Sequence, residues 1–269
     1  MTRIQLAADR GAMLMKLVSL LTASAIGIAL ASPARAADEA LGVRNAVLVH
    51  GAWADGSSWS KVIPILEKAG LHVTAVQNPL TSFEDDVAAT KRAIALQDGP
   101  VILVGHSWGG IVITEAGTDP KVAGLVYVAA FAPDAGVKVA DLGKDFAPPP
   151  GGAEIKPDAS GYLSLTWKGV SESFAPDLSP AERKLVFATQ GQTNSSVFGA
   201  QVTNVAWKTK PSWSVIAAND RMINPDLERQ QAKAIGAKAI TLPSSHVAML
   251  SHPREVANLI IEAARGARQ

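Results

Sequence analysis

From Asn45 onward, short apolar runs alternate with segments of helical periodicity, and this alternation limits the chain to few folds. The runs are almost continuously apolar and rich in β-branched residues, as expected for strands buried on both faces of a sheet. Alternation at this spacing predicts an α/β fold, with a mostly parallel sheet and helices on both faces. The predicted strands span 46–49, 72–76, 101–104, 124–128, 213–217 and 239–242, and the predicted helices span 58–69, 81–96, 108–117, 225–235 and 253–265.

The alternation is interrupted after the fourth predicted strand. More than 80 residues separate that strand from the next one, although about 12 could connect them. The stretch is rich in large apolar residues, which argues against a disordered loop, and it contains a clear helix start with Ser179 as N-cap and Glu182 three residues later. We therefore expect residues 133–210 to form a mostly helical cap, inserted into an α/β core of residues 37–132 and 211–269.

The N-terminal segment has the organisation of a secretory signal peptide. Arg3, Arg10 and Lys16 precede the uncharged apolar run 17–31, and small residues follow as far as Ala36. The apolar run has 15 residues, whereas a membrane-spanning helix needs ~20, so an uncleaved anchor is the weaker interpretation. We expect residues 1–36 to be a leader that is removed after export to the periplasm or the medium. A start at Met13 or Met15 would still leave a complete leader.

Charge and cysteine content exclude several classes of partner and chemistry. Residues 1–36 hold four basic side chains and one acidic one, so their removal changes the formal charge from +1 to −2. This balance gives no reason to expect binding to nucleic acid or stable insertion into a membrane. The sequence contains no cysteine, which rules out disulfides, thiol catalysis and thiolate metal sites.

The strongest functional motif is Gly105-His106-Ser107-Trp108-Gly109. It directly follows a predicted strand and directly precedes a predicted helix, which is the context of a nucleophile elbow. A side chain in place of either glycine would crowd the strained turn, and the dipole of the following helix favours negative charge developing at Ser107. We predict that Ser107 is a catalytic nucleophile. An idle serine in a structural turn is the alternative.

A serine nucleophile needs a base within hydrogen-bonding distance, and the sequence offers five histidines. His246 lies four residues past the last predicted strand, at the edge where the sites of open α/β sheets assemble. We predict His246 as the base, with His252 as its competitor, although a helix start such as that at His252 is more typical of capping. Structural positions are expected for the others: His50 in a loop, His72 at a partly exposed strand start, and His106 inside the elbow, pointing away from the serine.

The base in turn needs a carboxylate that fixes its tautomer and stabilises the imidazolium. Asp220 follows the predicted strand 213–217 and precedes His246, so the chain order is nucleophile, acid, base, as in other folds with a nucleophile elbow. Asp226 is the competing carboxylate, but its place at a helix start already suits the helix dipole. We predict Asp220 as the orienting acid.

Acyl transfer also needs two donors for the oxyanion. The backbone N–H of Trp108, which follows the nucleophile, is one candidate, and that of Ala52, in the loop after the first strand, is the other. Trp53 and Phe131 are candidates for the wall of the substrate pocket. Because the sequence has no metal-ligand cluster and no phosphate-binding glycine loop, we expect neither a cofactor nor a metal.

Four motifs together resemble the small α/β-hydrolases, in particular the branch that contains bacterial carboxylesterases, plant methyl-ester hydrolases and hydroxynitrile lyases. They are Val49-His50-Gly51-Ala52-Trp53, Gly105-His106-Ser107-Trp108-Gly109, Asn219-Asp220-Arg221 and Ser244-Ser245-His246-Val247. The resemblance covers roughly residues 44–265 and implies this fold and this triad. The leader is a departure, since many relatives are cytosolic.

Three functions are compatible with these residues. The first is a serine hydrolase that cleaves carboxylic esters of small to medium, largely apolar substrates through an acyl-enzyme intermediate. The second is a cofactor-free hydroxynitrile lyase, but the resemblance implies a lysine directly after the histidine in lyases, where this chain has Val247. The third is a small-molecule binding protein without catalysis, which the intact triad argues against.

Overall fold

The computed structural model describes residues 41–267, and its centre is a six-stranded parallel sheet. The strands lie in the order β2-β1-β3-β4-β8-β9, and every neighbouring pair is parallel. All six predicted strands are present, and the predicted α/β fold is confirmed. The bounds are β1 (Asn45–Val49), β2 (His72–Ala75), β3 (Val101–His106), β4 (Val122–Val128), β8 (Ser212–Ala217) and β9 (Lys238–Leu242).

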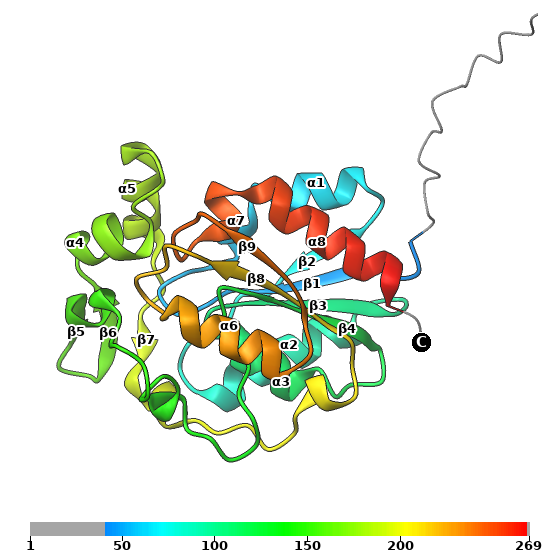
Figure 1. Cartoon of the computed structure of the whole chain (residues 1–269), viewed down its shortest axis with the longest axis horizontal. Helices are drawn as coiled ribbons and strands as arrows, with labels where there is room; N and C mark the ends of the chain where they lie inside the picture. Colours follow the sequence, from blue (N-terminus) through cyan, green and yellow to red (C-terminus); the bar gives the residue numbers. More distant parts are fainter. Residues whose placement is uncertain (1–40, 268–269) are drawn as a thin grey trace, which may run out of the picture. The chain divides into compact units, whose positions relative to one another are not determined.

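Helices cover both faces of this sheet (Figure 1). On one face α8 packs against α1 and against the central strands β3, β4 and β8. On the other face α2 and α3 pack together under β1 and β3, and α6 packs against β8. The bounds are η1 (Gly56–Trp59), α1 (Ile63–Lys68), α2 (Phe83–Ala95), α3 (Gly109–Ala116), α6 (Pro225–Ala234), α7 (Ala248–Ser251) and α8 (Pro253–Gly266).

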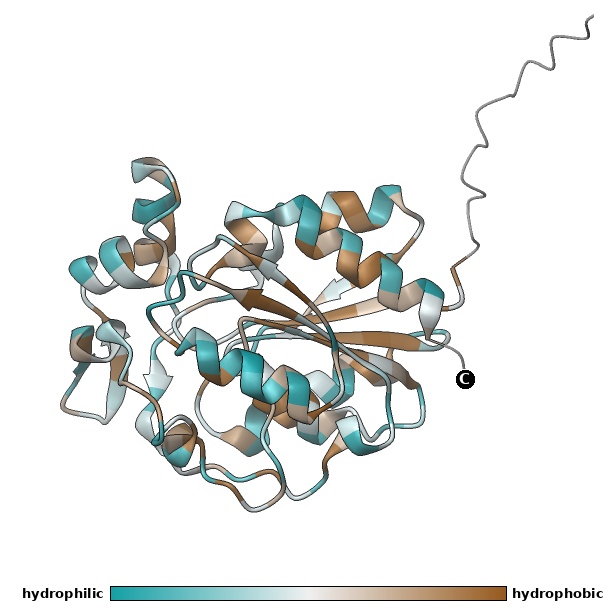
Figure 2. Cartoon of the chain, viewed as in Figure 1, coloured by the Kyte–Doolittle hydropathy of each residue, from teal (hydrophilic) through white to brown (hydrophobic). Residues whose placement is uncertain are grey.

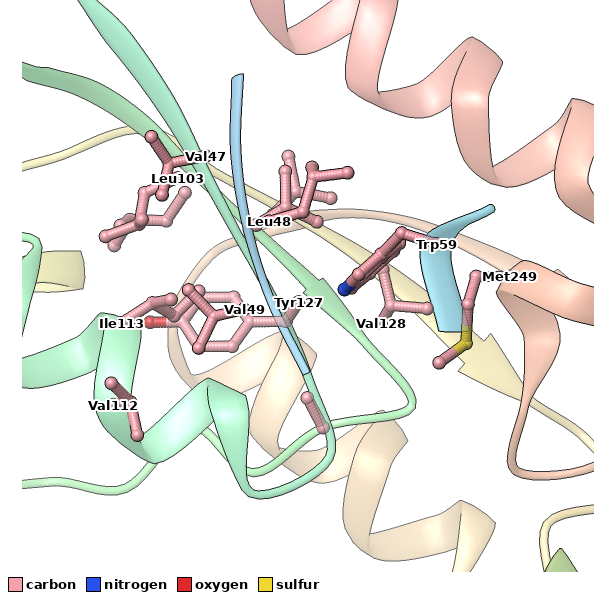
Figure 3. Close-up of a cluster of buried hydrophobic side chains, with 14 of the residues drawn as sticks. Val47, Leu48, Val49, Trp59, Leu103, Val112, Ile113, Tyr127, Val128 and Met249 are labelled. Carbon is pink, nitrogen blue, oxygen red and sulfur yellow. The ribbon is translucent and has the colours of Figure 1, made fainter. Parts of the chain in front are cut away.

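The core consists of side chains on both faces of the central strands. Val47 and Val49 lie on one side of β1, together with Ile113 of α3, whereas Leu48 lies on the other side, towards Trp59 (Figure 3). This alternation follows from the two-residue period of a strand. In Figure 2 the central strands are largely hydrophobic, and much of the visible surface of α6 is hydrophilic. Burial on both faces holds the strands rigidly, and with them the loops at their carboxyl ends.

The segment between β4 and β8 contains a small sheet as well as helices, which corrects the expectation of a mostly helical cap. Strands β5 (Ile155–Pro157), β6 (Tyr162–Leu165) and β7 (Thr193–Asn194) form this antiparallel sheet. A short helix, α4 (Trp167–Gly169), continues into a π-helical turn, Val170–Phe174. The predicted helix start is confirmed: α5 (Pro180–Thr189) begins with a capping box between Ser179 and Glu182.

The predicted leader, residues 1–36, lies outside the described residues. Near the start of the described part, the N–H of Val43 donates to the carbonyl oxygen of Ala264 in α8, which ties this end to the core. Within residues 41–267, none of the helices has the length and apolar character that crossing a membrane requires.

Candidate active site

Ser107 lies in the sharp turn that connects β3 with α3. Its φ is +54°, in the left-handed region, which costs free energy for any residue with a side chain. A Cβ atom on Gly105 would lie 2.5 Å from the carbonyl oxygen of Gly109, and one on Gly109 would lie 2.5 Å from that of Val49. Only glycine fits at either position, so the two glycines permit the strained turn that presents Ser107 at the carboxyl edge of the sheet.

Ser107, His246 and Asp220 form one continuous chain of hydrogen bonds. Ser107 Oγ lies 2.8 Å from His246 Nε2, and His246 Nδ1 lies 2.6 Å from Asp220 Oδ2. All three residues are buried. Because a carboxylate only accepts, Nδ1 carries the proton of the neutral ring, and Nε2 is left to accept the proton of the serine hydroxyl. The structure thus brings together three predicted residues that follow three different strands.

The backbone after β8 fixes the carboxylate of Asp220, whereas the competing carboxylate, Asp226, lies elsewhere. Asp220 Oδ1 accepts hydrogen bonds from the N–H groups of Met222, at 2.6 Å, and Ile223, at 3.0 Å. The carboxylate therefore cannot rotate without losing both charge-assisted bonds. Asp226 lies in the first turn of α6, where it pairs with Arg229 at 2.7 Å on the surface.

His106 is buried next to the candidate base and holds its backbone. Its Nε2 lies 3.0 Å from the carbonyl oxygen of His246, and the two ring centroids are 4.7 Å apart. Burial lowers the pKa of His106 well below its usual range. The prediction of a structural position is correct, but the contact with His246 was not predicted.

The remaining histidines make no hydrogen bond to Ser107. His50 Nε2 accepts the N–H of Asn78 at 2.9 Å, so this ring fastens the loop after β1. His252 stands at the N-cap of α8, but its side chain makes no capping hydrogen bond there. His72 starts β2 as predicted, and it is exposed there rather than partly exposed.

A cavity of about 190 Å³ opens beside Ser107 and His246. Both predicted pocket residues, Trp53 and Phe131, line it. None of the described residues in its wall carries a charge. The segment between β4 and β8 supplies much of that wall, through Val139, Pro149, Gly152, Ile155, Val197 and Phe198.

Trp53 is held rigidly between the core and the inserted segment. Its φ of +57° is in the left-handed region, like that of Ser107. Its backbone N–H donates to Thr193 Oγ1 at 3.3 Å, and its indole N–H donates to the carbonyl oxygen of Leu163 at 3.2 Å. The wall of the cavity next to the nucleophile is therefore shaped by residues of the small β5–β7 sheet.

The two predicted oxyanion donors border the same cavity as the serine. Ala52 and Trp108 both line it, and no acceptor within residues 41–267 is hydrogen-bonded to the backbone N–H of either residue. Free N–H groups beside a serine nucleophile are what an oxyanion hole requires. The helix that begins at Gly109 adds its N-terminal dipole on the same side.

The side chain of Trp108 is anchored by a buried acid. Its indole N–H donates to Asp86 Oδ2 at 2.8 Å, and the N–H of Leu80 donates to Asp86 Oδ1 at 2.8 Å. The ring of Phe83 packs edge-on against the indole, with centroids 5.9 Å apart. Burial raises the pKa of Asp86 to about 6. Neither this acid nor its role was predicted, since it lies on a different helix from the elbow.

Two residues of the inserted segment reach the loop that carries His246. The ring of Phe174 lies 5.2 Å from the ring of His246, measured between centroids. Asp177 accepts hydrogen bonds from the N–H of Ser245, at 2.8 Å, and from its hydroxyl, at 2.5 Å. Both contacts join residues that are far apart in sequence, and no local pattern signals them.

Comparisons with known proteins agree with this site. The model of the alpha/beta hydrolase family matches residues 46–259. A carbendazim-hydrolysing esterase from Nocardioides sp. (strain SG-4G) is 36% identical over 121 residues, so the match covers 39% of this chain and about half, 49%, of that protein. Salicylic acid-binding protein 2 from Nicotiana tabacum is 27% identical over 256 residues, which cover 82% of this chain and 97% of that protein.

A solved structure extends the similarity to the whole fold. The crystal structure of a pyrethroid hydrolase from Sphingobium faniae JZ-2 has a TM-score of 0.71 and 26% identity, and the match covers 83% of this chain and 98% of that one. The predicted resemblance is therefore confirmed at the level of family and fold. With its six-stranded sheet, its nucleophile elbow and a family model that spans most of its length, the chain belongs to the α/β-hydrolase family.

Proposed function

We propose that this protein is a serine hydrolase that cleaves carboxylic esters through an acyl-enzyme intermediate. The observation that carries the proposal is the hydrogen-bonded chain from Ser107 through His246 to Asp220, beside an apolar cavity. The similarity to proteins described as a carbendazim-hydrolysing esterase and a pyrethroid hydrolase supports the same class of reaction.

In the first half of the reaction Ser107 is acylated. Its Oγ attacks the ester carbonyl carbon while His246 Nε2 takes the hydroxyl proton, and Asp220 stabilises the resulting imidazolium. The negative oxygen of the tetrahedral intermediate accepts hydrogen bonds from the N–H groups of Ala52 and Trp108. Collapse of the intermediate breaks the bond to the alcohol oxygen, which leaves with the proton from His246.

In the second half water releases the acid. His246, neutral again, removes a proton from water, whose oxygen attacks the acyl carbon. A second tetrahedral intermediate uses the same oxyanion donors. When it collapses, the bond to Ser107 Oγ breaks, the serine oxygen takes the proton from His246, and the carboxylic acid departs.

The cavity favours a neutral substrate with an apolar group of limited size. A charged group placed against its apolar wall would lose hydration without gaining a partner. The volume of about 190 Å³ accommodates a small acyl or alcohol group. We also infer that residues 133–210 act as a cap, because they supply much of the wall of this cavity and contact the His246 loop.

For the alternative reaction, a hydroxynitrile lyase, the site lacks a cation at the place where the cyanide ion would leave. The residue after His246 is the buried Val247, which offers no charge to a cyanide ion. Two lysines of the inserted segment are exposed, pair with acids and do not line the cavity: Lys168 with Glu154, and Lys208 with Asp134. Hydrolysis is therefore the better-supported reaction.

A panel of p-nitrophenyl esters from acetate to octanoate tests this proposal, with mandelonitrile as the lyase substrate. We expect turnover of the shorter esters, complete inhibition by a serine-directed phosphonate, and a mass increase of one phosphonyl group on the peptide that carries Ser107. Negligible release of benzaldehyde from mandelonitrile is expected. Turnover of mandelonitrile that exceeds that of every ester would show that the reaction is lyase chemistry.

We propose in addition that the protein is exported and that residues 1–36 are removed. The proposal is supported by the basic residues Arg3, Arg10 and Lys16, the apolar run 17–31 and the small residues that end at Ala36. Intact-mass measurement of the protein from the periplasm or medium of a bacterial host tests it. A mature chain that begins at Ala37 is expected, and a retained N-terminal segment would contradict the proposal.

A further inference from the structure

Helix α6 places a second buried carboxyl group behind Asp220. Glu228 lies on the buried face of α6 and is only 3% exposed. Its Oε2 accepts a hydrogen bond from the N–H of Ala217, the last residue of β8, at 2.9 Å. Its Oε1 is buried and has no hydrogen-bond partner among the described residues, although the Asp220 carboxylate lies within hydrogen-bonding reach of the Glu228 side chain.

Two buried carboxyl groups in contact cannot both carry a negative charge, so one of them holds a proton. Asp220 accepts hydrogen bonds from two backbone N–H groups and from His246, and each of these stabilises its ionised form. Glu228 accepts only one, from Ala217. The proton therefore belongs to Glu228. Consistent with this assignment, burial and the neighbouring charge of Asp220 raise the pKa of Glu228 well above its usual range.

We propose that Glu228 is a positioning residue of the catalytic centre, whose protonated carboxyl group donates a hydrogen bond to the Asp220 carboxylate. A carboxylate offers about four positions for hydrogen-bond donors. Backbone N–H groups and His246 occupy three of those on Asp220, and the Glu228 hydroxyl occupies the fourth. This inference rests on the proposed function, in which Asp220 orients His246.

The neutral state of Glu228 sets how strongly Asp220 attracts the proton of His246. A donor on Asp220 disperses its negative charge, whereas a second anion would add to that charge and hold the imidazolium in its protonated form. Besides Asp220, the only charged neighbour that acts on Glu228 within the described residues is Arg229 of the same helix. Arg229 is half-exposed and paired with Asp226, so its effect is screened by solvent.

The variants Glu228→Gln and Glu228→Met distinguish a hydrogen-bond donor to Asp220 from a residue that only fills space in the core. Glutamine has the same shape, an oxygen to accept from Ala217 and an N–H to donate to Asp220 at every pH. Methionine has similar volume but no donor. Gln231→Met is the matched control, because Gln231 is also buried on α6 and also accepts one backbone N–H, from Ala132 at 3.1 Å, without a hydrogen bond to the triad.

The readout is the pH at which the His246 ring changes protonation, followed by NMR of the ring nitrogens without substrate. We expect Glu228→Gln and Gln231→Met to titrate as the wild type does. Glu228→Met is expected to move the midpoint upward by about one pH unit, because Asp220 loses one of its donors. The acid limb of kcat/KM for p-nitrophenyl butyrate should shift in the same direction, with a loss of about fivefold at the wild-type midpoint.

Two results would overturn the inference. A downward shift in Glu228→Gln would mean that the wild-type residue is ionised, because the substitution would then have removed a negative charge. A midpoint in Glu228→Met equal to that in Gln231→Met would reduce Glu228 to a packing residue. If Glu228→Met does not fold, Glu228→Gln still decides the protonation state. Absence of esterase activity would contradict the proposed function and leave the NMR titration interpretable.

Discussion

The ring of His106 donates a hydrogen bond from Nε2 to the backbone carbonyl oxygen of His246, across 3.0 Å. The other ring nitrogen, Nδ1, is buried and has no partner in the described part of the chain, so the proton of the neutral ring belongs on Nε2. Burial and the adjacent His246 hold the pKa of His106 well below its usual range. The ring therefore stays a neutral donor at working pH and fixes the loop of the proposed base.

Replacing His106 with leucine should weaken both activity and stability. The substitution leaves the His246 carbonyl oxygen buried without its donor, which costs about 1–3 kcal/mol in the free energy of unfolding. We expect kcat to fall about tenfold with little change in KM, since the substrate pocket is not altered. His72→Leu, on the exposed face of β2, is the control. Urea unfolding and ester kinetics measure both effects, and wild-type kcat in His106→Leu would contradict this role.

Ser107→Ala should abolish ester hydrolysis without unfolding the protein. Removal of a nucleophile that acts together with its base costs on the order of 10⁶ in kcat. Alanine has the same Cβ atom, so the strain at φ +54° and the packing stay the same. Circular dichroism and thermal unfolding should match the wild type. Ester turnover by Ser107→Ala near the wild-type rate would contradict an acyl-enzyme mechanism through Ser107.

His246→Ala and His252→Ala form a pair that tests the base. We expect the first to be nearly as damaging as Ser107→Ala, because the serine then loses the ring nitrogen that accepts its proton. The second should leave kcat within about threefold of the wild type, since His252 lies at the start of α8 and, within the described residues, its side chain is hydrogen-bonded only to Ser251. Steady-state kinetics on one ester compares them directly. The reverse ranking would assign the base to His252.

Asp86 predicts a specific dependence of stability on pH. Its pKa is about 6 in the folded protein against 3.8 for an ordinary aspartate, so the folded state binds its proton more tightly than the unfolded state does. The stabilisation is complete below pH 3.8 and is lost as the pH rises through 6, by up to about 3 kcal/mol.

Asp86→Asn removes this titrating group, so a comparison with the wild type isolates the contribution of Asp86 from those of other groups. The free energy of unfolding of the wild type, minus that of Asp86→Asn, should fall between pH 4 and pH 7. Urea unfolding at several pH values measures the difference. A constant difference over this interval would mean that burial does not shift the pKa of Asp86.

The sheet and the elbow could be predicted because their signals are local. β3 and β4 are buried along their whole lengths, so their sequences are continuously apolar. The glycines around Ser107 are needed by the turn itself. The order of strand ends also suffices to place Asp220 and His246 at one edge. The sequences of strands β5 and β6 contain no comparable apolar run, because these strands are short and most of their residues are only partly buried.

The supporting contacts of the site could not be predicted because each depends on where distant segments meet. Glu228 lies on the face of α6 that turns towards the core, which is unusual for an acid, but the sequence does not say that Asp220 stands opposite. Phe174 is an apolar residue like many others until the fold places its ring beside His246. Asp177 is likewise an ordinary acid until Ser245 meets it.

The two hydrogen bonds between Asp177 and Ser245 tie the inserted segment to the loop of the proposed base. Asp177 belongs to the inserted segment, whereas Ser245 immediately precedes His246. Any displacement of Asp177 would break both bonds and remove an anchor of the loop that carries His246. The packing of the inserted segment and the placement of the proposed base are therefore mechanically coupled, although the two lie far apart in sequence.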